Sequence, residues 1–213
     1  MDAELFPRPR TQVAPGAVHV PDWLDAERQR DLLAACREWA RPPAGLRTVR
    51  TPGGGTMTAR QVCLGWHWYP YGYARTVVDG DGTPVKPFPD RLGELGREAA
   101  RDALGVEATG YDIALINFYD ADARMGMHRD ADEKADAPVV SLSLGDTCVF
   151  RFGNPETRTR PYTDVELRSG DLFVFGGPSR LAYHGVPRVH PGTAPPELGL
   201  TGRLNITLRV SGR

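Results

Sequence analysis

The sequence is poor in cysteine, has no long apolar run and carries no excess of charge of either sign. Its three cysteines, Cys36, Cys63 and Cys148, are odd in number and lack CxxC spacing. This argues against a disulfide framework or a cysteine zinc site and is typical of a reducing compartment. No apolar run approaches the ~20 residues that a membrane-spanning helix needs, and no basic segment followed by an apolar one opens the chain. We therefore expect a cytoplasmic protein without a membrane partner.

The balance of charges limits the choice of partners. With 26 Lys and Arg against 27 Asp and Glu, the formal net charge is -1 at pH 7. A strongly basic surface that binds nucleic acid without specificity is therefore excluded, and any contact with nucleic acid must be local. The 213 residues, 40% hydrophobic and 25% charged, suffice for one ordinary globular domain. We expect residues 1–213 to form a single domain and a monomer.

Local patterns predict two helices in the first half of the chain. Apolar residues recur with helical spacing over residues 22–40 or 25–40, and Pro42-Pro43 ends the run. A second helix is expected over residues 90–104, with Gly105 as its C-cap. Residues 1–20, which contain several prolines and a glycine, are expected to form an extended arm on the surface with little regular structure.

The pattern changes to β structure after Gly105. Short runs rich in β-branched and aromatic residues are separated by Gly, Pro, Asp or Asn, at 111–119, 139–144, 148–152, 164–167, 171–175, 181–186 and 204–210. Strands of this length and spacing indicate two packed sheets in a roll or sandwich. The residues 187–202, rich in Pro and Gly, are expected to form a surface loop. The expected fold class is mainly β with flanking helices (α+β).

Two of these runs have one strongly polar face. In the last run, apolar residues at even positions alternate with Arg203, Asn205, Thr207 and Arg209. A solvated face of an antiparallel sheet would give the same pattern. The run 111–119 repeats it, however, because Asn117 and Tyr119 point away from its apolar residues. Amide, phenol and guanidinium groups on facing polar surfaces match the two ends of a five-carbon dicarboxylate.

His128 and Asp130 stand two residues apart, and His184 follows far downstream. Strand periodicity places the first two on one side of the chain, where both can reach one ion. Two imidazoles and one carboxylate leave coordination positions open, as in non-haem Fe(II) oxygenases. A lone His-x-Asp is often a solvated loop segment, and a lone histidine often caps a core. The combination with the polar strands favours a metal site.

The segment 41–89 differs in composition from the rest of the chain. It holds three consecutive glycines, several arginines and the aromatic residues Trp66, Trp68, Tyr69, Tyr71 and Tyr73. Aromatic rings beside arginines can stack on nucleobases, while a hairpin whose aromatic face packs on the core is also compatible with this composition. The arginines are either phosphate contacts or solvated surface residues: Arg47, Arg50, Arg60 and Arg75.

Residues 111–210 resemble the AlkB family of Fe(II)- and 2-oxoglutarate-dependent dioxygenases. The matching motifs include Asn117-Phe118-Tyr119, His128-Arg129-Asp130, Tyr183-His184-Gly185 and Arg203-Leu204-Asn205-Ile206-Thr207-Leu208-Arg209. Cys63-Leu64-Gly65-Trp66 and Tyr73 extend the resemblance more thinly toward the N-terminus. The resemblance implies a double-stranded β-helix, or jelly-roll, core over about residues 105–213 and a nucleotide-recognition lid over about residues 45–88.

The resemblance also implies Fe(II), 2-oxoglutarate and O2, and it assigns roles by position. The iron ligands would be His128, Asp130 and His184. The 2-oxoglutarate contacts would be Asn117, Tyr119, Arg203, Asn205 and Arg209. The substrate contacts would be Trp66, Tyr73, Asp132, Glu133 and Arg158, the last of which stands in a loop that departs from the family pattern.

These roles predict oxidative demethylation of N-alkylated bases, such as 1-methyladenine and 3-methylcytosine, with release of formaldehyde. Methylated DNA, and also RNA, would be the partner, single strands included, and the reaction would directly repair alkylation damage. Two alternatives stay open. The same iron site could act on a protein side chain or a small metabolite, or the jelly roll could be a binding module without chemistry. Salt-sensitive binding to oligonucleotides would favour nucleic acid.

Overall fold

The computed structural model describes residues 6–51, 53–70 and 72–213, so Tyr71 of the aromatic segment lies outside the described residues. The longer helices are α1 (Ala26–Trp39) and α2 (Asp90–Leu104), and short 3-10 turns are η1 (Gly177–Ser179) and η2 (Pro196–Leu198). The strands are β1 (Thr11–Ala14), β2 (Ala17–Val20), β3 (Arg47–Arg50), β4 (Thr56–Leu64), β5 (His67–Tyr69), β6 (Gly72–Ala74), β7 (Ile113–Tyr119), β8 (Met125–His128), β9 (Val139–Gly145), β10 (Thr147–Phe152), β11 (Thr163–Leu167), β12 (Leu172–Phe175), β13 (His184–His190) and β14 (Arg203–Arg209).

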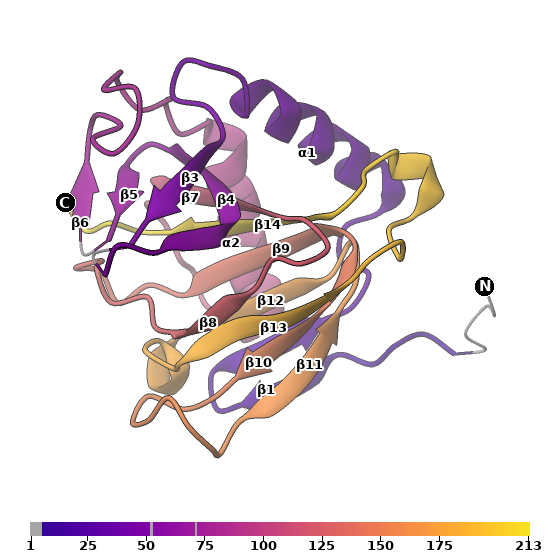
Figure 1. The fold of residues 1–213 in the computed structure, drawn as a ribbon. Coiled ribbons are helices and arrows are strands. Elements are labelled where there is room, and N and C mark those ends of the chain that lie inside the picture. Colours follow the sequence, from indigo (N-terminus) through magenta and orange to yellow (C-terminus); the bar gives the residue numbers. More distant parts are fainter. Residues whose placement is uncertain (1–5, 52, 71) are drawn as a thin grey trace.

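Two antiparallel sheets form a jelly roll. The larger sheet has the order β1-β2-β12-β9-β14-β7-β4-β3, and the smaller has the order β11-β10-β13-β8. Both helices lie on the side of the larger sheet that faces away from the smaller one (Figure 1). The strands β5 and β6 form a separate hairpin. The predicted jelly-roll core with flanking helices is confirmed.

The alternation of side chains divides the interior into two cores. Leu204, Ile206 and Leu208 of β14 pack with α1 and α2 on the outer face of the larger sheet. The space between the sheets is filled by aromatic residues of β10 and β12, chiefly Phe150, Phe152, Phe173 and Phe175. Because successive residues of a strand point to opposite faces, the polar residues of β14 must point into this second interior. The interior between the sheets is therefore polar where it meets β14, and the candidate site lies in this polar part.

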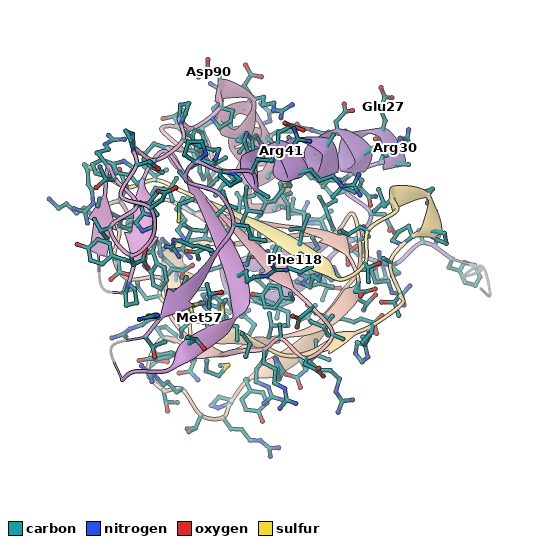
Figure 2. The ribbon with its side chains drawn as sticks, turned by 45° about the horizontal axis from the view of Figure 1, so that its top comes forward. Glu27, Arg30, Arg41, Met57, Asp90 and Phe118 are labelled. Carbon is teal, nitrogen blue, oxygen red and sulfur yellow. The ribbon has the colours of Figure 1, made fainter. Side chains whose placement is uncertain are left out.

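The helices begin and end where the sequence signals predict. The Asp25 side chain accepts a hydrogen bond from the Arg28 backbone N–H at 2.8 Å, which caps α1. Gly105 ends α2 in the left-handed conformation, as expected. Figure 2 shows Glu27 and Arg30 on the outer, exposed side of α1, opposite its buried face. Neither α1, α2 nor any other helix in the described ranges is long and apolar enough to cross a membrane.

Two expectations about irregular segments were wrong. Within residues 1–20, β1 and β2 pair with each other and with β12, so this segment forms an edge of the larger sheet. The predicted loop over residues 187–202 begins within β13, which continues to His190 through pairing with β10. In both cases a strand distant in sequence forms the hydrogen bonds of the backbone N–H and C=O groups. The local composition of a segment does not predict such a partner.

The predicted lid segment, residues 45–88, consists of two parts. Its strands β3 and β4 extend the larger sheet, because β4 pairs with β7. Its hairpin β5–β6 stands beside that sheet, with Trp68 opposite Tyr73 in register. The lid hairpin, which we define as residues 66–74, is thus mounted directly on a strand of the sheet that carries the polar site.

Candidate active site

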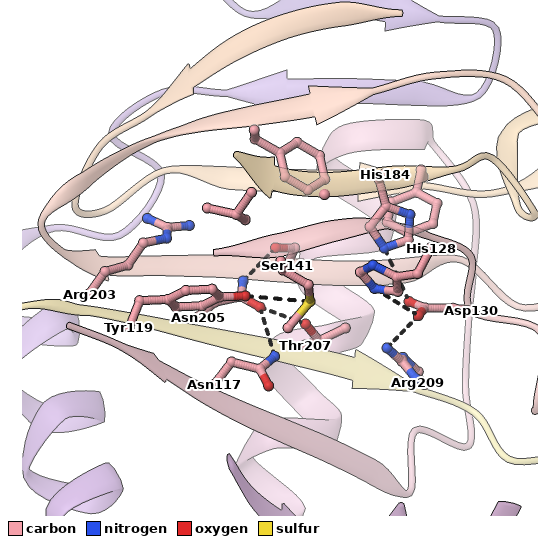
Figure 3. A pocket seen from close by; sticks show the side chains of 15 residues that line it. Asn117, Tyr119, His128, Asp130, Ser141, His184, Arg203, Asn205, Thr207 and Arg209 are labelled. Atoms are coloured by element: carbon pink, nitrogen blue, oxygen red, sulfur yellow. Dashed lines mark hydrogen bonds and ion pairs between the residues drawn. The ribbon is translucent and has the colours of Figure 1, made fainter. Parts of the chain in front are cut away.

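Two neighbouring strands of the smaller sheet bring His128, Asp130 and His184 together. His128 ends β8 and His184 begins β13, and the two are direct partners in the pairing of these strands. The Nε2 atoms of His128 and His184 lie 3.8 and 3.7 Å from the carboxylate oxygens of Asp130. One ligand atom from each residue lies within 4.8 Å of those of the others (Figure 3). This cluster has the composition of a three-ligand metal site with open positions.

Hydrogen bonds fix the orientation of both imidazoles. The Nδ1 atom of His128 lies 2.9 Å from the Gly126 carbonyl, and that of His184 lies 2.9 Å from the Ala182 carbonyl. A proton on Nδ1 leaves the lone pair of Nε2 directed at the cluster, as in many metal sites. Burial and the neighbouring His128 lower the pKa of His184 to about 4. His184 is therefore neutral at pH 7, the form that binds a metal.

Asp130 is a buried carboxylate whose charge is stabilised by a cation. Burial by itself would raise its pKa, but Arg209 and the two imidazoles outweigh burial and lower the pKa to about 2. The Arg209 Nη2 atom lies 2.7 Å from Asp130 Oδ1. The other oxygen, Oδ2, is buried and accepts no hydrogen bond from the described residues. A buried anionic oxygen without a donor fits a cation bound between Asp130 and the imidazoles.

The polar faces of β7 and β14 form the floor of the same pocket. Asn117 pairs in register with Asn205, and Tyr119 with Arg203. These strands are neighbours, so the polar residues share one face of one sheet; the expectation of two facing polar surfaces was wrong. The pocket is lined by Asn117, Tyr119, His128, Asp130, Ser141, His184, Arg203, Asn205, Thr207 and Arg209, among others (Figure 3).

Arg203 and Arg209 stand at opposite ends of this floor, as the first and last residues of β14. Arg203 donates to Ser143 Oγ at 2.9 Å and is 1% exposed. The Nε atoms of Arg203 and Arg209 are buried and have no acceptor among the described residues. Two buried guanidinium groups with unused donors, separated by the amides of Asn117 and Asn205, fit a dicarboxylate that spans the floor.

A larger cavity of about 500 Å³ opens beside this floor. It includes His128, Asp130 and Arg209, so it adjoins the three-residue cluster. Its remaining wall comes from residues that flank these positions and from other segments: Thr51, Met57, Gln61, Trp68, Pro70, Leu115, Asn117, Met125, Gly126, Met127, Arg129, Ala131, Asp132 and Arg158. A cavity of this volume can contain a nucleobase, and it brings one close to the cluster.

The substrate contacts carried over from the resemblance do not all lie on this cavity. Asp132 and Arg158 line it, whereas Trp66, Tyr73 and Glu133 are not among its lining residues. The Glu133 side chain is fully buried and pairs with Arg180 and Arg209, each at 3.0 Å, and it accepts a hydrogen bond from the Tyr73 hydroxyl. Roles for Trp66, Tyr73 and Glu133 as substrate contacts stay predictions that the cavity lining does not support.

The arginines of residues 41–89 also differ in their placement. Arg47 is largely buried, lies 3.3 Å from Asp79 and donates to the Trp68 carbonyl, so it holds the lid hairpin. Arg50, Arg60 and Arg75 are exposed. From the sequence, Trp68 was named among the aromatic residues of this segment, but no site role was assigned to Trp68, Arg129 or Tyr183. The guanidinium carbons of Arg129 and Arg158 lie 5.1 and 5.5 Å from the Tyr183 ring centroid, at the edge of the cavity.

The jelly roll, the cluster of two imidazoles with one carboxylate and the two buried arginines define a non-haem Fe(II), 2-oxoglutarate-dependent oxygenase. Comparison with known proteins agrees. The family described as "2OG-Fe(II) oxygenase superfamily" matches residues 16–209. The "Alpha-ketoglutarate-dependent dioxygenase AlkB homolog" of Caulobacter vibrioides is 39% identical over 211 residues, covering 97% of this chain and 92% of that protein. This chain belongs to the AlkB family within that superfamily.

Other relatives extend the likeness. The "DNA N(6)-methyladenine demethylase ALKBH1D" of Arabidopsis thaliana is 32% identical over 221 residues, which span 92% of this chain but only 50% of that protein. The solved structure described as "The structure of OsALKBH1" superposes with a TM-score of 0.83 at 32% identity and covers 93% of this chain. Fe(II), 2-oxoglutarate and O2, predicted from the sequence, are the cofactors that the superfamily implies.

Proposed function

We propose that the protein oxidatively demethylates N-alkylated bases, such as 1-methyladenine and 3-methylcytosine, in DNA and also in RNA, as direct repair of alkylation damage. One observation carries the proposal. The cavity that adjoins His128, Asp130 and His184 has an indole, a carboxylate and two arginines on its wall, from Trp68, Asp132, Arg129 and Arg158. Flat, anionic and cationic groups in one cavity suit the ring, the positive charge and the phosphate of a methylated nucleotide.

Each group of side chains has a separate task in this proposal. His128, Asp130 and His184 would hold Fe(II) and leave positions open. Arg203 and Arg209 would pair with the carboxylates of 2-oxoglutarate, and Asn117, Tyr119 and Asn205 would bind it along the floor. With O2, these bound groups supply the oxidation of an N-methyl carbon. The protein fixes the distance between that carbon and the iron site and keeps water out.

The overall reaction balances with these components. The N-methyl base, O2 and 2-oxoglutarate yield the hydroxymethyl base, succinate and CO2. One oxygen atom of O2 enters the hydroxymethyl group and the other enters succinate. The hydroxymethyl base then loses formaldehyde, because the C–N bond breaks and the nitrogen takes up the hydroxyl proton. A base inside a duplex cannot reach the cavity, so it must be extruded, and a methylated, poorly paired base costs least to extrude.

The relatives support this assignment by their names. The Arabidopsis thaliana relative is a "DNA N(6)-methyladenine demethylase", and the Caulobacter vibrioides relative is an AlkB homologue. The chain spans half of the first and nearly all of the second. We also propose a single domain, a monomeric state and a cytoplasmic location, on the basis of the contiguous jelly roll and the reduced state of its cysteines.

The test is a turnover assay with purified protein, Fe(II), 2-oxoglutarate, ascorbate and oligonucleotides that carry 1-methyladenine, 3-methylcytosine or N6-methyladenine. Mass spectrometry should show that the oligonucleotide loses the mass of one CH2 unit. One molecule of formaldehyde should be released for each base that is demethylated. His128→Ala and Asp130→Ala should abolish turnover, while Arg97→Gln on the exposed side of α2 should leave it unchanged. Consumption of 2-oxoglutarate without demethylation of any oligonucleotide would instead favour a protein side chain or a small metabolite as substrate.

A further inference from the structure

The chain offers two indoles to a nucleobase, Trp66 and Trp68, two residues apart around the start of β5. We infer that Trp68 is the stacking platform and that its indole N–H also orients Asp132 for recognition of the base. The inference rests on the proposed function, which it deepens by naming the residues that select the base. It differs from the resemblance, which places Trp66 in that position.

Trp66 already has a guanidinium group stacked on one face and a hydrogen bond at its indole nitrogen. The Arg75 guanidinium carbon lies 3.5 Å from the Trp66 ring centroid, the distance of a stacked cation–π pair. The Arg213 guanidinium carbon lies 5.8 Å from the same centroid. The indole Nε1 donates to Asp112 Oδ2 at 3.1 Å. A base that stacks on the face covered by Arg75 must displace this arginine, which also donates to the Gly65 carbonyl at 2.8 Å.

The turn at Gly65 accounts for the different directions of the two indoles. In a continuous strand, residues 66 and 68 would share one face. Gly65, however, follows the end of β4 with a φ of +78°, and a Cβ atom there would meet the Asp112 carbonyl, so the chain turns before β5 begins. Trp66 lies within this turn and Trp68 within β5, and the strand rule does not relate them.

Trp68 lines the cavity and is held from behind. Its backbone N–H donates to Cys63 Sγ at 3.4 Å, and its carbonyl accepts a hydrogen bond from Arg47. The side chain packs against the buried group formed by Cys63, Tyr73, Ile113 and Leu115. A half-buried indole with a fixed backbone loses little freedom when a base stacks on it. Such a platform suits every base, because each has a π-face.

Asp132 is joined to the platform by a hydrogen bond. The Trp68 indole Nε1 donates to Asp132 Oδ2 at 2.9 Å, and both residues line the cavity. One carboxylate oxygen is thereby fixed, and the carboxylate has capacity for further donors. The exocyclic amino group of adenine or cytosine is a donor, and N-methylation at the ring edge makes the base a cation. Both features favour a fixed carboxylate beside the stacked ring.

The experiment compares the two indoles directly under anaerobic conditions, with Fe(II) and 2-oxoglutarate present so that binding is measured without turnover. Fluorescence anisotropy gives the dissociation constant for a single strand with one 3-methylcytosine. Trp68→Ala should weaken binding roughly 5- to 150-fold, the range for loss of one stacking aromatic. Trp66→Ala should change it less than about threefold. Thermal melting curves show whether each variant folds. Where an alanine variant does not fold, Trp66→Phe or Trp68→Phe replaces it in the binding measurement.

A second measurement tests the hydrogen bond. Trp68→Phe keeps an aromatic ring but removes the donor to Asp132, so the preference for 3-methylcytosine over cytosine should fall. Asp132→Asn should lower the same preference, and the double variant should lose little more than either single one, because the two residues act as a pair. Additive losses would overturn the orienting role.

Two outcomes separate this inference from the proposed function. If the unaltered protein binds and demethylates the oligonucleotide, but Trp66→Ala weakens binding as much as Trp68→Ala or more, the assignment of Trp68 is wrong while the function stands. If the unaltered protein neither binds nor demethylates any methylated strand, the proposed function fails, and the role of Trp68 with it.

Discussion

Glu133 and Arg209 form a buried ion pair, with Glu133 Oε1 3.0 Å from Arg209 Nη1. The Glu133 side chain is fully buried, and its second oxygen lies 3.0 Å from Arg180 Nη2. Arg180 in turn donates to the Asp130 carbonyl at 2.7 Å. Glu133 thus connects an arginine of the floor, the backbone of a candidate metal ligand and, through the Tyr73 hydroxyl, the lid hairpin.

Replacing Glu133 should therefore disturb the fold and the 2-oxoglutarate pocket together. Glu133→Ala removes the carboxylate that Arg180 and Arg209 share, although Arg209 keeps Asp130 as a partner. Breaking a buried ion pair costs about 3–5 kcal/mol. Glu133→Gln keeps an acceptor and should fold, but its affinity for 2-oxoglutarate should fall several-fold because Arg209 is less firmly held. Chemical denaturation and calorimetric titration of 2-oxoglutarate check both effects. Asp132→Asn is the matched control, and an equal loss of 2-oxoglutarate affinity in that variant would contradict the assignment.

Arg129 and Arg158 lie over one ring, that of Tyr183, at the edge of the cavity. Both are exposed, and no ion pair joins either of them to a carboxylate within the described ranges, so both are available to phosphate. Arg129→Gln and Arg158→Gln should weaken binding of methylated and unmethylated strands alike and reduce the slope of log K against log salt by about 1 each. Arg97→Gln should leave the slope unchanged. A loss confined to methylated strands would indicate contact with the base instead.

Gly65 should tolerate no side chain. A Cβ atom there would lie 1.9 Å from the Asp112 carbonyl oxygen, and the φ of +78° is itself unfavourable for other residues. Gly65→Ala should lower the free energy of unfolding by more than about 2 kcal/mol, since backbone must move to admit the methyl group. Gly53→Ala is the control, because a Cβ atom at Gly53 meets nothing within 4 Å. Urea denaturation of both variants measures the difference, and equal midpoints would show that the turn adapts.

Asp171 should make stability depend on acid pH. It is fully buried, with His19 Nε2 at 2.8 Å and Arg8 at 2.6 Å. Burial opposes its charge, but hydrogen bonds from His19, Arg8 and the backbone prevail and lower its pKa to about 2. A lowered pKa stabilises the fold above the unfolded value near 4, and this contribution is lost as pH falls toward 2.

The expected consequence is a pH-dependent difference between the unaltered protein and Asp171→Asn. At pH 7 the variant should be less stable by about 2 kcal/mol, the equivalent of the shift in pKa. Between pH 4 and pH 2 the difference should shrink, because the carboxylate of the unaltered protein becomes protonated. Denaturation curves at several pH values measure it. A difference that stays constant down to pH 2 would show that the charge of Asp171 is not the cause.

Much of the fold follows from local signals. The bounds of α2 and its end at Gly105 depend on apolar spacing and on the left-handed conformation that glycine permits, and both are local properties. The polar face of β14 follows from the two-residue period of a strand. The strands β1 and β2 were not predicted from the sequence. They pair with each other, and β2 pairs with β12, which lies more than 150 residues away in the sequence.

The sequence by itself determined the chemical inventory: two imidazoles and a carboxylate for a metal, two arginines on one strand face for a dicarboxylate, and a segment dense in aromatic rings. Residue type fixes what a side chain can ligate or pair with, and strand period fixes which neighbours share its face. Only the tertiary structure decided that Trp68 lines the cavity while Arg75 covers Trp66, and that Glu133 is buried between arginines. The direction of a side chain after a tight turn and the extent of its burial depend on residues far away in the sequence. No local sequence pattern contains that information.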